Sequence, residues 1–351
     1  MEKKSLEFLK GLMETISPSG FEEEAIKVWK ERTKNFADEI ENDVHGNTIA
    51  VLNKRGKPRI MLAGHIDEIG YMVKYIDKEG YVYFSTIGGV DLHLVPGQRV
   101  WFKTKKAKVL GVVGRKPKHL LEEEEKRKIS KIEELYIDIG AKDEKEAKSI
   151  LNIGDPAVPA VGFENLRDDL VVARGFDDKA GAFIVSETLR LLSQEKIKSS
   201  VYGVATVQEE IGLRGAKTSA YGISPDIGIA IDVTFATDYP GMDKRKIGDI
   251  KLGGGPVINR GPNVTSKVFD LLIETAEQEK ISYQVDSTPG ATPTDANVLQ
   301  LTKAGVATGL VSIPNRYMHT PVEVVSLKDL ENISKLLSTF ILRIDEKNDF
   351  I

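Results

Sequence analysis

Residues 204–212 read Val-Ala-Thr-Val-Gln-Glu-Glu-Ile-Gly, so an apolar, strand-like run ends in two adjacent carboxylates, Glu209 and Glu210. Successive side chains of an extended segment point to opposite sides. The pattern therefore predicts two different tasks for the pair, one carboxylate binding a metal ion and the other holding a water molecule. The alternative is a solvated turn after a strand, because glutamate is mostly exposed in proteins. The other acidic residues and histidines favour the metal site.

Four further apolar runs end in a side chain that can bind a metal ion. These runs lead to His65, to Asp177 and Asp178, to Asp232, and, shortly after residues 308–313, to His319. In open α/β sheets, sites form in the crevice outside the carboxyl ends of the strands, so we expect these residues to converge. Two histidines and three carboxylates, one of them shared, would satisfy two zinc-like ions about 3.5 to 4 Å apart without any cysteine.

Six motifs, in this order, resemble those of one enzyme family. They are Gly-His-Ile-Asp-Glu-Ile-Gly (64–70), Phe-Asp-Asp-Lys (176–179), Val-Gln-Glu-Glu-Ile-Gly-Leu-Arg-Gly-Ala (207–216), Ala-Ile-Asp-Val-Thr (230–234), Thr-Asp-Ala (294–296) and Tyr-Met-His-Thr (317–320). Over essentially its whole length the chain resembles the TET-type aminopeptidases, a group with glutamyl, leucyl and deblocking members. These are the tetrahedral, self-compartmentalising enzymes of the MH clan of metallopeptidases that use two metal ions.

The resemblance implies a complete ligand set for two ions. The ligands would be His65, Asp177, Glu210, Asp232 and His319. Asp177 would bridge both ions, His65 and Asp232 would complete the shell of one, and Glu210 and His319 would complete that of the other. The chain departs from the family pattern at none of these positions.

Two of the motifs also have a physical interpretation of their own. Asp177 and Asp178 stand where a strand gives way to a helical pattern, so either could cap the helix while the other binds. The resemblance selects Asp177 as the bridge and implies a cis peptide bond between the two acids. Asp67 lies two residues from His65 on an extended segment, and we expect it to orient the imidazole without binding the ion. The alternative for His65 is an ordinary interior histidine.

Glu209 is the predicted general base. A water molecule between two divalent ions has its pKa lowered toward about 7, so a nearby carboxylate need only accept its proton and pass it to the departing amine. We therefore assign the catalytic roles to Glu209 and, in support, to Asp67.

Composition excludes several other classes of protein. The 351 residues are 41% hydrophobic and 29% charged, which predicts two domains with a sizeable core. The net charge of −4 argues against a nucleic-acid partner. No apolar run is long enough to span a membrane, and the absence of cysteine excludes disulfides and thiolate ligands. We therefore expect a cytoplasmic protein.

The glycine-rich stretch Gly-Gly-Gly-Pro (253–256) is not followed by Gly-Lys-Ser/Thr. It predicts a turn, and no nucleotide cofactor is expected.

The pattern of strands and helices predicts two domains, one inserted in the other. Expected helices span about 4–15, 21–35, 179–193, 265–280 and 327–343, and expected strands about 47–52, 59–63, 70–76, 81–84, 99–102, 108–113, 201–207, 227–232 and 305–312. Residues 1–68 and 162–351 should form a discontinuous α/β catalytic domain with the mixed sheet of the zinc exopeptidases. Residues 69–161 should form a smaller β-barrel, PDZ-like, to which the resemblance assigns dimerisation and oligomer contacts.

The predicted function is that of a zinc- or cobalt-dependent aminopeptidase that releases N-terminal residues from short peptides. The resemblance implies homo-oligomers in which dimers assemble into a hollow tetrahedral dodecamer. One alternative is an N-acyl amino acid deacylase or a carboxypeptidase of the same clan. Another is an inactive peptide-binding scaffold. A cellulose hydrolase is disfavoured, because glycosidases work with two carboxylates and need no metal.

Overall fold

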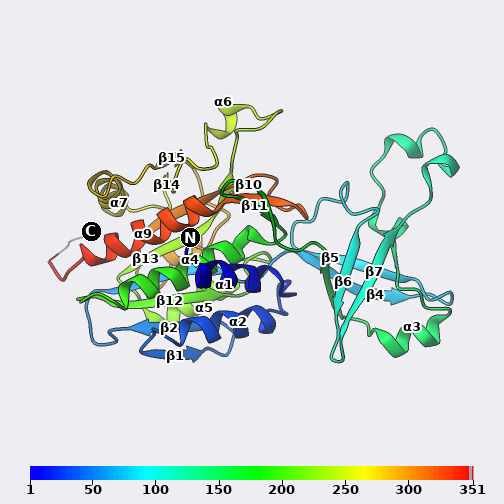
Figure 1. Cartoon of the computed structure of the whole chain (residues 1–351), viewed down its shortest axis with the longest axis horizontal. Helices are drawn as coiled ribbons and strands as arrows, with labels where there is room; N and C mark the ends of the chain where they lie inside the picture. Colours follow the sequence, from blue (N-terminus) through cyan, green and yellow to red (C-terminus); the bar gives the residue numbers. More distant parts are fainter. Residues whose placement is uncertain (348–349, 351) are drawn as a thin grey trace.

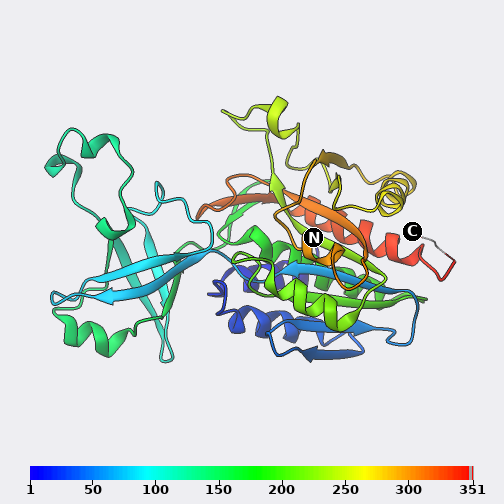
Figure 2. The ribbon, with the colours of Figure 1, turned by 180° about the vertical axis from the view of Figure 1, so that it is seen from behind.

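The structure, a computed structural model, describes residues 1–347 and 350 of the chain. Figure 1 shows two parts along the long axis, a larger α/β part that carries both termini and a smaller β-rich part at the other end. Figure 2, from behind, shows the segment around α6 (Lys244–Ile247) projecting from the larger part. None of the described helices is both long and apolar enough to cross a membrane.

A mixed sheet of eight strands forms the centre of the α/β part. Its strands, in spatial order, are β1 (Glu39–Asn42), β2 (Thr48–Leu52), β12 (Ser200–Thr206), β3 (Arg59–His65), β13 (Ile227–Phe235), β16 (Ala307–Asn315), β14 (Val257–Arg260) and β15 (Gln284–Ser287). The central strands β12, β3, β13 and β16 are parallel to one another. They are apolar and buried on both faces, which is typical of parallel strands covered by helices.

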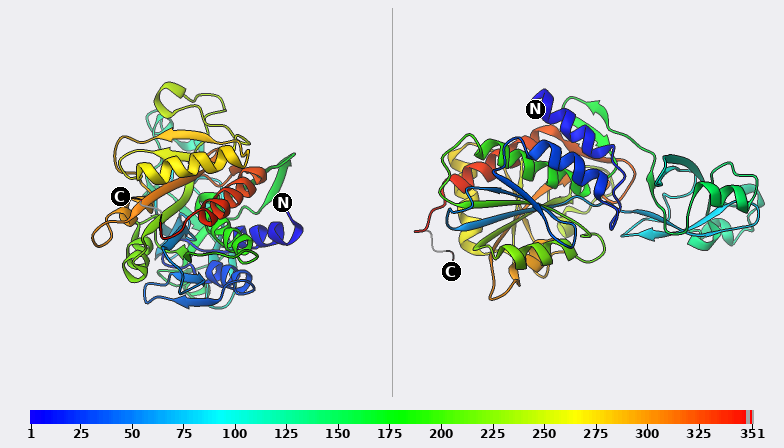
Figure 3. Two further views of the ribbon diagram at one scale, coloured as in Figure 1. Left: turned by 90° about the vertical axis from the view of Figure 1, so that its left-hand side faces the viewer. Right: turned by 90° about the horizontal axis from the view of Figure 1, so that it is seen from below.

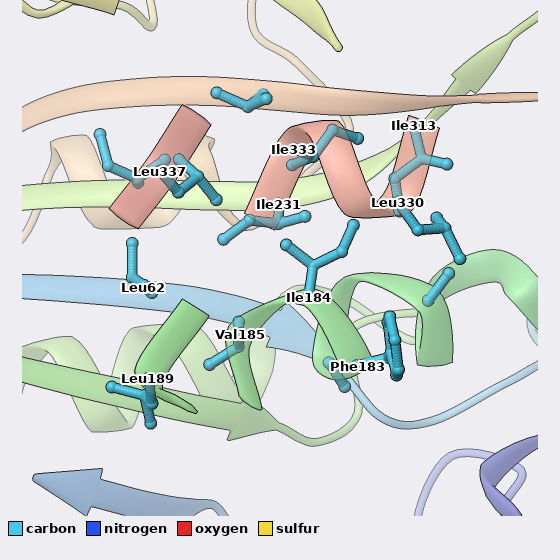
Figure 4. Packing of buried hydrophobic residues seen from close by; sticks show 14 of the residues in the cluster. Leu62, Phe183, Ile184, Val185, Leu189, Ile231, Ile313, Leu330, Ile333 and Leu337 are labelled. Atoms are coloured by element: carbon cyan, nitrogen blue, oxygen red, sulfur yellow. The ribbon is translucent and has the colours of Figure 1, made fainter. Parts of the chain in front are cut away.

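Helices cover both faces of this sheet, as the right-hand view of Figure 3 shows. One layer contains α1 (Lys3–Met13), α2 (Glu23–Thr33), α4 (Phe176–Leu192), α7 (Ser266–Gln278) and α9 (Leu327–Leu342); the other contains α5 (Arg214–Ile223) and α8 (Ala296–Gln300). Successive residues of β3 point to opposite faces of the sheet. Leu62 packs on the side of α4, and Met61 packs on the side of α5. In Figure 4, Ile184 of α4 and Ile333 of α9 meet Ile231 of the sheet.

The smaller part is a closed barrel with its own core. Its strands are β4 (Gly70–Ile76), β5 (Val82–Ile87), β8 (Tyr136–Asp138), β7 (Lys108–Gly114), β6 (Arg99–Lys103) and β9 (Pro156–Pro159), in that order around the barrel. Tyr71, Phe84 and Phe102 belong to its buried cluster. Three short 3₁₀ helices (Lys118–Leu120, Glu125–Arg127 and Ile132–Glu134) and α3 (Glu144–Ile150) lie between its strands in sequence. The predicted mixed α/β fold with a β-barrel is therefore confirmed.

A three-stranded sheet of β10 (Glu164–Arg167), β11 (Leu170–Ala173) and β17 (Glu323–Ser326) completes the fold. In its register Glu323 of β17 lies opposite Ala173 of β11. This pairing places Glu323, which lies far along the sequence, beside the segment that leads into α4.

One expectation about local structure is wrong. Strand β12 ends at Thr206, and Gln208 has a φ of 56°, in the left-handed region. Glu209 and Glu210 therefore lie on a turn after the strand, and the alternation of an extended segment does not separate their side chains. The elements α5, β14 and β15 were not among those predicted from the sequence.

Candidate active site

The sheet brings three of the predicted site residues to one edge. Strand β3 ends at His65, and β12 ends at Thr206, its direct neighbour in the parallel register. Asp232 lies on β13, the neighbour of β3 on its other side. Because the carboxyl ends of parallel strands meet at the same edge, His65, Asp232 and the turn that carries Glu209 come together.

Asp177 lies between two histidines that are far apart in sequence. Its Oδ1 is 3.2 Å from Nε2 of His65, and its Oδ2 is 3.1 Å from Nε2 of His319. Oδ1 of Asp232 is 3.9 Å from Nε2 of His65, and Oε2 of Glu210 is 3.5 Å from Nε2 of His319. All the residues predicted as ligands therefore meet, in two groups that share Asp177.

The donor atoms of this cluster fit divalent ions of the zinc type. Ligand atoms of His65, Asp177 and Glu210 lie within 4.8 Å of one another, as do those of His65, Asp178 and Asp232. Oε1 of Glu210 is buried and has no hydrogen-bond partner within the described part of the chain. Such ions take imidazole nitrogens and carboxylate oxygens, and a buried carboxylate oxygen needs a cation or a donor beside it.

The cluster is crowded with buried acidic side chains whose pKa values are shifted. Burial raises the pKa of Glu209 to about 10, and the charge of Asp232 adds to the rise. Burial likewise raises the pKa of Asp232 to about 8. Burial also opposes the ionisation of Asp177, but hydrogen bonds from His319 and His65 outweigh it and lower its pKa. Cations would relieve the repulsion between these carboxylates.

The two adjacent aspartates at the start of α4 have separate tasks. Oδ1 of Asp178 accepts a hydrogen bond from N of Gly181 (3.0 Å), as a helix cap does, and Oδ2 accepts one from N of His65 (3.1 Å). Asp178 therefore caps the helix and holds the backbone of His65, while Asp177 faces both histidines. The peptide bond between the two aspartates is cis, as the resemblance implied.

Comparison with known sequences identifies the family of the chain. The family model of the M42 glutamyl aminopeptidases matches residues 46–336. The chain belongs to this M42 family. It is 39% identical over 334 residues to a lysyl aminopeptidase of Pyrococcus furiosus, an alignment that covers 94% of each protein.

Solved structures agree with this family. A TET aminopeptidase from a marine-sediment Thaumarchaeota archaeon is 37% identical, with a TM-score of 0.94, covering 98% of this chain and 97% of that one. The TET1 peptidase of Pyrococcus horikoshii is 32% identical, with a TM-score of 0.87, covering 97% of this chain and all (100%) of that one. The predicted resemblance is confirmed, and so is the predicted enzyme class: this M42 protein is an aminopeptidase, a metal-dependent hydrolase of peptide bonds.

In this M42 aminopeptidase, Asp67 supports the site in more ways than expected. Its carboxylate accepts hydrogen bonds from N of Glu209 (3.1 Å), N of Glu210 (3.2 Å) and Oγ of Ser19 (2.6 Å). Nδ1 of His65 is 3.2 Å from the carbonyl oxygen of Asp67 and 3.5 Å from its Oδ1. Asp67 contacts the imidazole most closely through its backbone, and its side chain holds the turn that carries both glutamates.

Glu209 and Glu210 differ in their position along the cluster. Oε2 of Glu209 is 3.6 Å from Nε2 of His65, whereas Glu210 faces His319. Both side chains are directed toward the same cluster, and the left-handed Gln208 sets the turn that allows this. The two carboxylates are therefore distinguished by the histidine that each one meets.

Sequence reasoning missed Glu323, which is 2% exposed. Its Oε2 accepts a hydrogen bond from N of Asp177 (3.0 Å), and its Oε1 accepts one from N of His319 (3.0 Å). It thus holds the backbone of two predicted ligands that lie far apart in the sequence. A single acidic residue beside the apolar pair Val324-Val325 was the only sequence signal of this role.

Asp295, of the Thr-Asp-Ala motif (294–296), also lies near the cluster. It is 2% exposed, and its Oδ2 accepts a hydrogen bond from Oγ1 of Thr206 (2.7 Å). Its Oδ1 has no hydrogen-bond partner among the described residues. The loop between β5 and β6 of the barrel also contributes, since the carbonyl oxygen of Gly89 is 3.0 Å from Nδ1 of His319.

Proposed function

We propose that His65, Asp177, Glu210, Asp232 and His319 hold two divalent metal ions in this aminopeptidase, with zinc or cobalt as the ions. The observation that carries the proposal is the position of Asp177, which presents one carboxylate oxygen to each histidine, at 3.2 Å and 3.1 Å. When bound, such ions polarise a carbonyl group and lower the pKa of a water molecule.

The protein's own residues have catalytic and positioning roles in this reaction. Glu209 is the general base that takes the proton of the attacking water and passes it to the departing amine. Asp67 holds the backbone of Glu209 and Glu210, and Glu323 holds that of Asp177 and His319, so each supports one side of the cluster. Asp67 and Glu323 are therefore positioning residues.

The substrates proposed are short peptides with a free amino terminus. The P. horikoshii TET1 peptidase is described as assembling into a tetrahedron or a large octahedral shell, and a related TET1 structure as a dodecamer. We propose that this chain likewise forms dimers that assemble into a tetrahedral dodecamer, with residues 69–161 making subunit contacts. An enclosed site would admit peptides and exclude folded proteins. The cytoplasmic location stays a prediction.

The decisive experiment uses protein stripped by a chelator and reloaded separately with zinc, cobalt or manganese. Hydrolysis of unblocked dipeptides and tripeptides should vanish with the metal and return with it. The same peptides carrying an N-acetyl group should resist. Cleavage of only the acetylated peptides would favour the deacylase alternative, and binding without cleavage under every metal would favour the scaffold.

A further inference from the structure

A row of side chains leads from the metal cluster to the edge of the sheet. Asp232 of β13 is the register partner of Ser312 on β16, Ser312 pairs with Val257 on β14, and Asn259 of β14 pairs with Asp286 on β15. Register partners point to the same face, as do residues two apart on a strand. Asp232, Ser312, Asn259 and Asp286 therefore share one face, and all four line the cleft that contains the cluster.

Asn259 has an unused hydrogen-bonding group in this cleft. Its side chain is 4% exposed, and its Nδ2 donates to Oγ1 of Thr288 (3.1 Å). Its Oδ1 is buried without a hydrogen-bond partner in the described part of the chain. Buried carbonyl oxygens are normally paired, so this one suits a ligand that brings a donor.

Asp286 is a carboxylate without a cation beside it. Its Oδ1 accepts a hydrogen bond from N of Ser287 (2.7 Å), and no described lysine, arginine or histidine forms an ion pair with it. The described residues that line the cleft include no lysine or arginine, and the two histidines belong to the metal cluster. The outer wall of the cleft therefore offers acceptors and negative charge.

Building on the aminopeptidase function proposed above, we propose that Asn259 and Asp286 form the subsite for the side chain of the N-terminal residue and select lysine or arginine. The distance from β13 to β15 spans three strand spacings, about 14 Å. When the backbone of the N-terminal residue binds at the metal cluster, only a long side chain can approach Asp286 on the far wall of the cleft. Leu310, which lines the same cleft, can contact the apolar stem of such a side chain. An N-terminal glutamate would be repelled.

The test compares kcat/KM of the metal-loaded enzyme on dipeptides that differ only in the first residue: Lys, Arg, Met or Glu. We expect Lys and Arg to exceed Met by about tenfold, the size of one charge-assisted hydrogen bond, and Glu to be the poorest. In Asp286→Asn the Lys-to-Met ratio should fall about tenfold. In Asp286→Lys, Glu should gain relative to Lys. Because each ratio is measured on one preparation, partial loss of folded protein cancels.

The control variant is Asp91→Asn. Asp91 is an exposed carboxylate that lines a neighbouring pocket on the barrel side of Asp177 and His319, and neither Asn259 nor Asp286 lines that pocket. Its loss should leave the Lys-to-Met ratio within about twofold of wild type, as expected of a screened surface charge. An equal fall in both variants, or a wild-type ratio near one, would overturn the subsite while leaving the aminopeptidase function intact. Failure to cleave any of the four dipeptides under every metal would overturn that function and the subsite together.

Discussion

At the scale of single residues, the site depends on carboxylates whose neighbours differ. Asp177 faces two histidines, Asp178 faces backbone N–H groups, and Glu209 lies on a turn held by Asp67. Carboxylates in such different surroundings can bind a metal, cap a helix or move a proton. Substitutions that keep the shape and remove only the charge distinguish these roles.

Glu209→Gln should leave a folded, metal-loaded enzyme that has lost about 10²- to 10⁴-fold in kcat, the usual contribution of a general base. Metal content by elemental analysis and steady-state hydrolysis of an unblocked dipeptide measure the two effects. Glu195→Gln, at an exposed position, is the matched control and should behave as wild type. Undiminished hydrolysis by metal-loaded Glu209→Gln would remove Glu209 from the mechanism.

Glu323→Gln should weaken metal binding by about 10- to 100-fold, as loss of an outer contact to a metal ligand commonly does. Glutamine has one acceptor oxygen, so either Asp177 or His319 loses the acceptor of its backbone N–H. Titration of the stripped protein with zinc, followed by calorimetry, gives the affinity. Saturating metal should restore most of the activity, and a variant that binds zinc like wild type would contradict the positioning role.

At the scale of elements, a buried ion triad joins the end of β3 to the start of α4. Glu68 accepts hydrogen bonds from Nζ of Lys179 (2.6 Å) and from the guanidinium of Arg174, and all three side chains are at most 5% exposed. Burial opposes ionisation of Glu68, but the charges of Arg174 and Lys179 outweigh it and lower its pKa below the usual 4.5. These ion pairs connect the segment that follows β3 and His65 to the start of α4, where Asp177 lies.

Glu68→Gln should therefore lower the free energy of unfolding at pH 7 by about 3 to 5 kcal/mol, because two buried cations lose their counter-charge. The folded-state pKa of Glu68 is depressed, so its stabilisation is present above pH 4.5 and is lost as the pH falls through the folded-state value. Urea unfolding of both proteins between pH 7 and pH 3 should show the difference shrinking below pH 4.5. A difference that stays constant over this range would exclude an ionic role.

At the scale of the whole molecule, the barrel presents apolar side chains to solvent. Leu110 and Val112 lie two apart on β7, are 41% and 47% exposed, and share a face with Trp101, the register partner of Leu110 on β6. A face of this kind on the outside of a barrel is typical of an interface. It is the part of residues 69–161 that we expect subunit contacts to cover.

Wild-type protein should elute in size-exclusion chromatography with light scattering at about twelve times the mass of one chain, following the dodecamer described for a relative. Leu110→Glu combined with Val112→Lys should shift it to smaller species, because charges are costly to bury in an interface. Ser85→Lys, at an exposed position on β5, is the control. An unchanged mass in the double variant would place the contacts elsewhere.

The sequence by itself determined the fold class, the order of the motifs and the kinds of ligand, because strands, helices and their ends follow from local hydrophobic periodicity and turn residues. Residues such as His65 and Asp232 could be predicted since each ends or follows an apolar strand. The residues alone left open which aspartate binds and which caps, and only the resemblance selected Asp177; the tertiary structure places Asp177 between both histidines and Asp178 at the helix cap. It alone revealed that Glu323 and the side chain of Asp67 hold the backbone of the cluster. The row from Asp232 to Asp286 likewise exists only through strand register. Register, crossovers and the left-handed turn at Gln208 bring residues together across the whole chain, and no local pattern encodes such contacts.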